Sequence, residues 1–223
     1  ESNEIDKYVK GASASAGLIY DVTGDSKFST THINLGAGYK IDLPNLLGQF
    51  RIGIQPSITQ KKIDLSGLRF DNQYNGYSYD GSLSAGENLP RLSRWYFDAA
   101  LGLQYSKQIH DKLKARTSIA VYNLLSPKQS FFNTNAIQLE RRYSWQINTL
   151  YQLNNKIRIQ PGFHFLNQGT YYAFNFGSLF QYDLSKTKYF KQAFFVGTYF
   201  RAVDSGDLIL GMDYDRWRVA LSY

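Results

Sequence analysis

The sequence predicts an all-β fold, and within that class a transmembrane antiparallel up-and-down outer-membrane β-barrel. The first observation is the alternation of apolar and polar residues along most of the 223-residue chain, because a period of two is that of a β-strand. The second is the length of the alternating segments, about 9 to 14 residues, which a tilted strand needs to cross a bilayer. The third is an aromatic share of 16%, since lipid-facing strands carry aromatic girdles.

The alternation is clearest in three consecutive segments between Tyr143 and Leu184. In YSWQINTLYQL, IRIQPGFHF and YAFNFGSLFQYDL, apolar and aromatic residues occupy one face, while amide and charged residues occupy the other. A soluble sheet with one buried face has the same pattern as a barrel in a bilayer. The segment length favours the barrel, because strands in soluble proteins have about 5 or 6 residues. We therefore expect the apolar faces to contact lipid and the polar faces to line an enclosed interior.

The rest of the chain supplies the other strands and brings the expected total to about eleven. They are expected at residues 9–22, 30–43, 50–58, 97–106, 112–125, 192–201, 208–214 and 216–223. Glycine recurs on the polar face of the first three, where it leaves room in a lumen or allows the sheet to coil. Bacterial single-chain barrels have an even number of strands, so we expect terminal strands outside this sequence and about 12 to 14 strands in the complete protein.

Two long stretches, 61–94 and 126–139, interrupt the alternation. Both follow an odd-numbered strand, whereas the turns near 43–48, 109–111, 154–156 and 214–215 follow even-numbered strands. In an up-and-down barrel, odd and even connections lie at opposite ends. Long loops outside and short turns in the periplasm are the arrangement of outer-membrane barrels. We therefore predict a single barrel domain over residues 1–223, with two long extracellular loops.

Composition argues against several other classes of protein. The chain has no cysteine, so a disulfide framework and a thiolate metal site are excluded. No run of about 18 apolar residues occurs, so no transmembrane helix is predicted. The net charge of +7 raises the question of nucleic acid. The basic residues are scattered over turns and polar faces without forming a patch, so nucleic acid is not an expected partner.

No catalytic, metal or cofactor site is predicted. The three histidines, His32, His110 and His164, occur singly, without the spacing of a metal site or a hydrolase. We interpret His32 and His164 as polar-face residues that are hydrogen-bonded to their neighbours, and His110 as a turn residue. The stretch DNQYNGYSYDG lacks the ligand spacing and the terminal glutamate of a calcium loop, so we expect a flexible outer loop there.

The polar faces of the last strands carry charges that are placed to pair across neighbouring strands. We expect these charges to form a network inside the barrel that plugs or stiffens it. The alternative is a selectivity ring that lines an open pore. The residues are Arg158, Asp183, Arg201, Asp213, Arg216 and Arg218.

The order of segments along the chain resembles that of the PorP/SprF family of type IX secretion membrane proteins from Bacteroidota. The resemblance lies in FDAALGLQYSKQI, KARTSIAVYNLLSP, RRYSWQINTLYQLNNKIRIQPGFHFL, YYAFNFGSLFQYD, FFVGTYFR and LILGMDYD. It covers most of the chain from about Gly11 onward and is weakest over 61–94. It implies an outer-membrane β-barrel that works with the type IX machinery and helps to export or anchor large surface proteins such as gliding adhesins. It implies no catalytic residues.

The resemblance also implies the partners: outer-membrane lipid, the C-terminal domain of a secreted type IX cargo, and other type IX secretion components. Exposed aromatics concentrate binding energy, so the candidate contact residues are the aromatics of the two long loops. These are Tyr74, Tyr77, Tyr79, Phe131 and Phe132. Two other classes stay open at this point. One is an outer-membrane channel or transporter for a small or hydrophobic solute, and the other is a soluble sandwich or lipocalin-like binder, which would need a solvated exterior.

Overall fold

The computed structural model describes residues 10–44, 48–65, 67–84, 86, 92–131, 137–186, 191–202, 204–215 and 217–223. Eleven strands follow one another along the chain. They are β1 (Ala12–Thr23), β2 (Phe28–Leu43), β3 (Gly48–Lys62), β4 (Ser93–His110), β5 (Leu113–Tyr122), β6 (Arg142–Gln152), β7 (Ile157–Gln168), β8 (Tyr171–Lys186), β9 (Lys191–Arg201), β10 (Ser205–Tyr214) and β11 (Trp217–Ser222). One turn of 3-10 helix, η1 (Asp71–Gln73), lies between β3 and β4. Among the described residues, no helix has the length and apolar character needed to cross a membrane.

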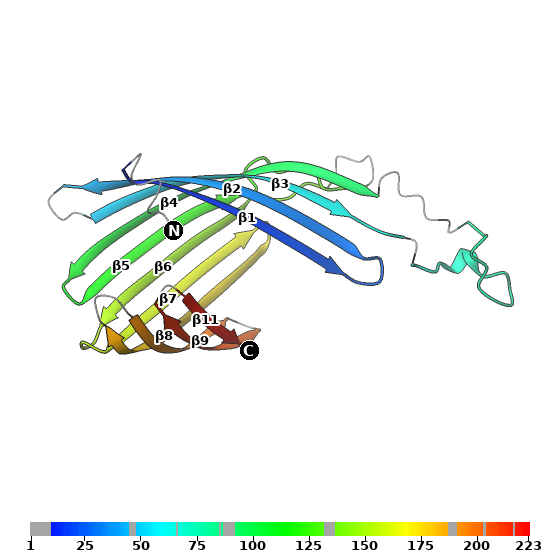
Figure 1. Ribbon diagram of the computed structural model, residues 1–223. Helices are drawn as coiled ribbons and strands as arrows, with labels where there is room; N and C mark the ends of the chain where they lie inside the picture. Colours follow the sequence, from blue (N-terminus) through cyan, green and yellow to red (C-terminus); the bar gives the residue numbers. More distant parts are fainter. Residues whose placement is uncertain are drawn as a thin grey trace.

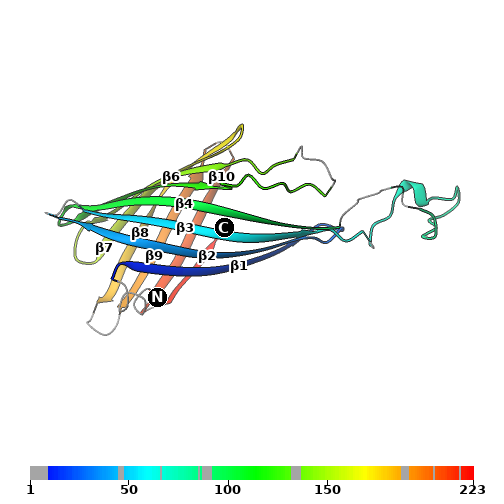
Figure 2. The same ribbon diagram turned by 90° about the horizontal axis from the view of Figure 1, so that it is seen from above.

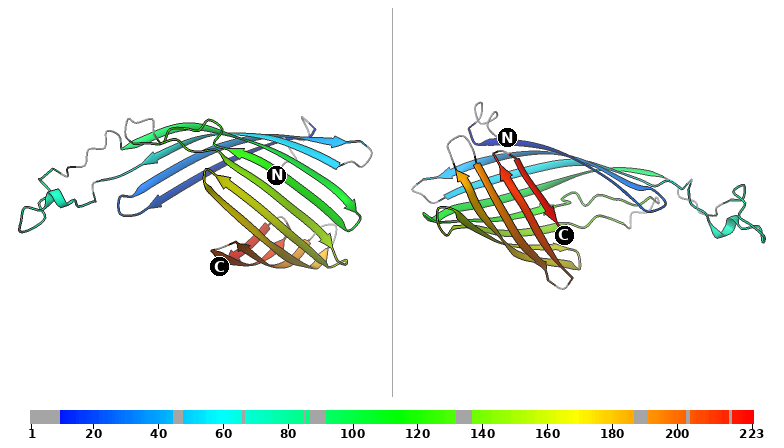
Figure 3. Two further views of the ribbon diagram at one scale, coloured as in Figure 1. Left: turned by 180° about the vertical axis from the view of Figure 1, so that it is seen from behind. Right: turned by 60° about the horizontal axis from the view of Figure 1, so that its bottom comes forward.

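The strands form one antiparallel sheet in which each strand pairs with the next along the chain. This confirms the predicted all-β, up-and-down fold class. The sheet is open, with β1 and β11 as its two edges; within the described ranges no ladder joins them. It curls strongly, so that β1 to β4 and β8 to β11 face each other across its concave side (Figure 1, Figure 3).

The two faces of the sheet differ in chemistry. Large apolar side chains alternate onto one face, where many are about half exposed, as at Ile52, Phe176 and Phe200. The buried strand side chains all alternate onto the other face; they are Thr59, Asp98, Ser106, Gln181, Asp183, Ala193, Phe195 and Asp213. Curvature crowds side chains on the inside of a sheet, so the polar face is the concave one. In the described part of the chain no second sheet covers the apolar convex face, which has the character of a lipid-contacting surface.

The two long connections lie at the same end of the sheet, which we call the long-connection end. The β3–β4 arm (63–92) reaches far beyond the strands, and the β5–β6 loop (123–141) stays beside them (Figure 2). The opposite, short-turn end carries the connections at 44–47, 111–112, 153–156, 187–190 and 215–216. The strands β3 and β4 are longer than the alternation predicts, so the arm begins and ends a few residues inside the predicted range of 61–94.

A row of small residues crosses the concave face of the first five strands. In the strand register, Ser13 lies opposite Gly38, Gly38 opposite Gly53, Gly53 opposite Gly102 and Gly102 opposite Ala120. A Cβ built on Gly38 would come within 2.9 Å of the Ser13 hydroxyl, so a larger residue there would displace its neighbour. Side chains of this row therefore project little from the concave face, whereas the concave face of β7 to β11 carries long side chains.

Candidate functional site

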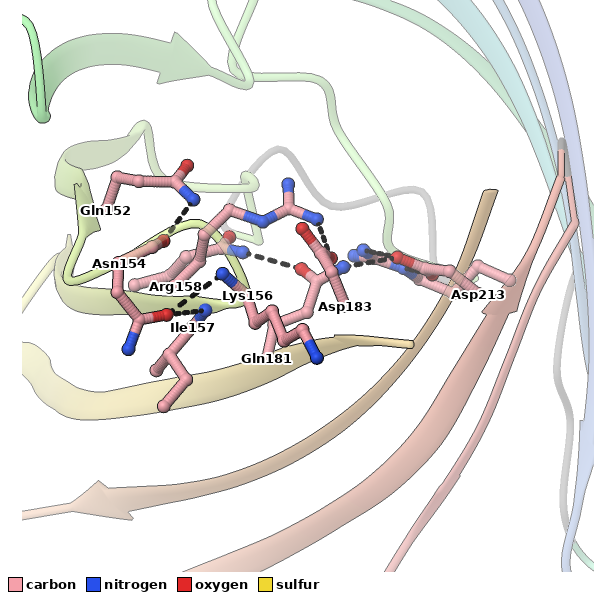
Figure 4. Close-up of polar contacts among 10 residues, drawn as sticks. Gln152, Asn154, Lys156, Ile157, Arg158, Gln181, Asp183 and Asp213 are labelled. Atoms are coloured by element: carbon pink, nitrogen blue, oxygen red, sulfur yellow. Dashed lines mark hydrogen bonds and ion pairs between the residues drawn. The ribbon is translucent and has the colours of Figure 1, made fainter. Parts of the chain in front are cut away.

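A buried ion pair joins β7 and β8 near the short-turn end (Figure 4). Arg158 Nη2 donates to Asp183 Oδ1, and the two side chains are 12% and 3% exposed. The β6–β7 turn places Arg158, because the side-chain oxygen of Asn154 accepts the backbone N–H groups of Lys156 and Ile157, each at 2.9 Å. Such side-chain acceptance is how asparagine stabilises a tight turn. Removal of either partner would leave the other charge buried without a counter-ion, which is strongly destabilising.

A second ion pair joins β10 and β11 at the same end. Arg218 donates from Nε to Asp213 Oδ1 at 2.6 Å and from Nη2 to Asp213 Oδ2 at 2.8 Å, which is the bidentate geometry that favours arginine. The Arg218 guanidinium also lies 4.8 Å from the ring centroid of Phe195, within the range of a cation–π contact. Gly211 makes room for this ring, since a Cβ there would overlap Phe195 Cζ.

Two glutamines connect the second ion pair to β7 and β8, close to the first pair. Gln181 is buried, donates to Asp213 Oδ2 at 2.9 Å and accepts from Gln160 Nε2 at 3.2 Å. The resulting short-turn cluster holds four of the six predicted network residues, Arg158, Asp183, Asp213 and Arg218. Gln160 and Gln181 are not singled out by the sequence pattern, although they share the polar face with these charges.

The other two predicted network residues are not in the short-turn cluster. Arg201 lies towards the long-connection end, where its Nη1 is 3.6 Å from Asp204 and both side chains are at least half exposed. Arg216 lies outside the described residues. The predicted charges therefore do not form one ring in the part of the chain that the structure describes.

The β3–β4 arm ends in a small hairpin where the sequence predicts a flexible loop. Tyr74 and Tyr79 form an antiparallel bridge, and the side-chain oxygen of Asn75 accepts the N–H groups of Tyr77 and Ser78, each at 3.0 Å. Tyr74, Tyr77 and Tyr79 are 60%, 96% and 43% exposed, and Arg69 lies 4.8 Å from the Tyr79 ring centroid. The hairpin thus displays three tyrosines at the far end of the arm.

Asp80 closes the base of this hairpin. Its N–H donates to Gln73 O at 2.7 Å, and its Oδ1 accepts from Ser82 Oγ at 2.6 Å and Ser82 N at 2.9 Å. The two hydrogen bonds from Ser82 hold the pKa of Asp80 below the usual value for aspartate, and the one from the hydroxyl has the larger effect. The carboxylate form is therefore the one that orders the turn.

The β5–β6 loop folds against the concave face at the long-connection end of the sheet. The rings of Phe131 and Phe28 meet edge to face with centroids 6.2 Å apart, and Lys61 Nζ donates to Gln129 Oε1 at 2.6 Å. Phe131 is partly buried. Phe132, the other aromatic predicted as a contact residue here, lies outside the described residues. The freely exposed candidates are thus the three tyrosines of the arm.

The histidines are engaged with neighbouring polar groups. His32 Nδ1 is 2.8 Å from Thr59 Oγ1, and His164 Nε2 is 2.9 Å from Ser144 Oγ. His110 is the last residue of β4 rather than a turn residue, and its Nδ1 accepts from Lys112 N in the adjoining turn at 3.5 Å. Within the ranges that the structure describes, no three His, Asp or Glu side chains gather into a group able to hold a metal ion.

Comparison with known families places nearly the whole chain in one of them. The model of the family described as type IX secretion system membrane protein PorP/SprF matches residues 2–223. No curated protein matches the sequence. Because the match spans nearly the whole chain, this protein belongs to the PorP/SprF family of type IX secretion system membrane proteins.

Proposed function

We propose that this protein is a noncatalytic outer-membrane component of the type IX secretion system that helps to export or anchor large cell-surface proteins, such as gliding adhesins. Membership of the family supports a place in the secretion machinery. The exposed apolar convex face supports contact with lipid, and closure of the sheet in the outer membrane would satisfy the backbone groups of its two edges. The long-connection end then faces the cell exterior.

The observation that carries the proposed role is the hairpin at the end of the arm. Tyrosine contributes a large, rigid contact area and is enriched among residues that dominate binding energy. Tyr74, Tyr77 and Tyr79 are exposed together on a hairpin already ordered by Asn75. Binding there loses less conformational entropy than binding to a disordered loop. The arm is therefore the surface that we assign to the C-terminal domain of the secreted protein.

The test removes the aromatic rings and keeps the hairpin. The variant Tyr74→Ser/Tyr77→Ser/Tyr79→Ser is compared with Tyr20→Ser/Tyr171→Ser, whose tyrosines are also exposed and lie near the same end of the sheet. Secreted proteins that co-purify from solubilised outer membranes are quantified. Loss of the three tyrosines should weaken cargo retention about tenfold or more, with no change in the control. Undiminished retention by the arm variant would refute the assignment.

A further inference from the structure

The concave wall of β2 to β5 carries a group of basic residues near the short-turn end that the secretion role does not use. We call Lys40, Arg51, Lys114 and Arg116 the cation cluster. Arg51 lies opposite Lys40 in the register of β2 and β3. Like charges at directly opposite positions destabilise a sheet, so folding alone does not favour this arrangement.

Acidic partners do not neutralise the cation cluster. Lys40 Nζ is 3.5 Å from Asp42. In the described part of the chain, the side chains of Arg51, Lys114 and Arg116 make no ion pair or hydrogen bond. Apart from Lys40 opposite Arg51, their concave-face neighbours in register are uncharged, namely Gln104, Ser106, Gln108, Asn148 and Leu150. The cluster thus combines four cations with one paired carboxylate.

The opposite wall shows that the fold neutralises cations where their role is structural. On β7 to β11, Arg158 pairs with Asp183 and Arg218 pairs with Asp213. The cation cluster lies at the same end of the same concave face but has no such matched carboxylates among the described residues. The described residues of this wall therefore leave the cations of the cluster largely unmatched, which favours the binding of an acidic partner.

Space for that molecule lies directly beside the cations. A hollow of about 390 Å³ is lined by Lys40, Arg51, Gln104 and Ser118, together with Gly38 and Gly53 of the small-residue row. A second hollow of about 650 Å³ is lined by Ser106, Gln108 and Lys114, and also by two carboxylates, those of Asp42 and Asp111. The row of small residues leaves this space open beside the arginine and lysine side chains.

We infer that the cation cluster is a docking surface for an acidic segment of a polypeptide. The cluster extends over four strands, roughly 14 Å at the usual strand spacing, which is wider than one phosphate or carboxylate group. An extended chain with acidic residues at alternate positions places its carboxylates about 7 Å apart on one side, so two or three of them fit the cluster. Lipid is not the occupant, because the cluster lies on the face opposite the apolar one.

The surface is separate from the arm, which lies at the other end of the sheet, so the inference and the proposed cargo contact fail independently. The test uses the whole protein in detergent and a fluorescent ten-residue peptide of alternating aspartate and glycine. The matching asparagine–glycine peptide is the uncharged probe. Anisotropy should show binding of the acidic peptide that weakens as salt is added, and no binding of the uncharged one.

Two charge-matched variants locate the binding. Arg51→Gln/Arg116→Gln should weaken the acidic peptide about tenfold or more, as expected for the loss of two charge-assisted contacts. Lys62→Gln/Lys107→Gln removes two cations from convex-face positions and should leave the affinity unchanged. Arg51→Glu/Arg116→Glu should bind a lysine–glycine peptide instead. The inference would be overturned if Arg51→Gln/Arg116→Gln and Lys62→Gln/Lys107→Gln bound the acidic peptide with equal affinity. It would also be overturned if inorganic phosphate, added at the same concentration of negative charge, displaced the peptide completely.

Discussion

Asp213 and Arg218 lie directly opposite each other on β10 and β11 and are joined by two hydrogen bonds, of 2.6 and 2.8 Å. Asp213 also accepts from the buried Gln181, so one carboxylate connects the last hairpin to β8. Close by, Arg158 and Asp183 pair between β7 and β8. Polar side-chain contacts on the concave face therefore link β7, β8, β10 and β11 in addition to the backbone ladders.

The buried pair should be far more important for stability than the exposed one. Asp183→Ala leaves Arg158 desolvated without a carboxylate, so we expect the free energy of unfolding to fall by about 3 to 5 kcal/mol. Asp204→Ala removes the half-exposed partner of Arg201 and should cost less than about 1 kcal/mol. Denaturant unfolding of the refolded protein measures both. Similar losses of unfolding free energy in the two variants would show that the buried ion pair is no more important for stability than the exposed one.

Gly211 should not tolerate a side chain. A Cβ at this position overlaps Phe195 Cζ and Val219 O, so Gly211→Ala has to displace the ring that lies against Arg218. We expect a destabilisation of about 1 to 3 kcal/mol, as for other overpacked sites. The matched control is Gly102→Ala, because the nearest atom to its Cβ would be 3.8 Å away, at ordinary contact distance. If Gly102→Ala is as harmful as Gly211→Ala, crowding is not the cause.

The hairpin of the arm should loosen in acid. The pKa of Asp80 is lowered by its hydrogen bonds from Ser82, so its contribution is present above the usual aspartate pKa and is lost as the pH falls through the lowered value. A pH titration of the Ser82 amide signal by NMR should follow this protonation. Asp80→Asn should abolish the titration, and a Ser82 signal that titrates unchanged in this variant would contradict the assignment.

The contact between the β5–β6 loop and β2 should be measurable as a coupling. The edge-to-face rings of Phe28 and Phe131 predict an interaction free energy of about 0.5 to 1.5 kcal/mol in a double-mutant cycle to alanine. Partial proteolysis should show faster cleavage of the loop in Phe131→Ala, while the strands stay intact. A coupling of zero with an unchanged cleavage rate would mean that the loop is held by other contacts.

The fold class follows from the sequence because alternation continues through nearly every strand. The strand ends do not follow from it: Thr59 to Lys62 and Ser93 to Tyr96 extend β3 and β4 beyond the apolar belt, where both faces are polar or mixed and the period of two is lost. The arm hairpin has a local signal, since Asn75 is followed by Gly76 and that dipeptide is typical of tight hairpin turns. An isolated turn between two polar runs is weak evidence for paired strands.

The candidate sites were predictable only to the level of which face each residue occupies. The pattern places Arg158, Asp183, Asp213 and Arg218 on the polar face, and these four meet at the short-turn end. Which charges actually pair depends on the register between strands, which the sequence does not specify. The packing of Phe131 on Phe28 depends on how a long loop folds back across β3 and β4, and no sequence period encodes that.

We propose that the convex face contacts lipid and that the concave face does not, and adjacent residues of β8 allow the most direct test. Because the chain lacks cysteine, single cysteines at Phe176 (convex) and Asn175 (concave) can each be labelled with a polarity-sensitive fluorophore in liposomes. We expect quenching of the label at position 176 by lipids with brominated acyl chains, and quenching of the label at 175 by aqueous iodide. Equal quenching at the two positions, or the reverse pattern, would contradict the claim.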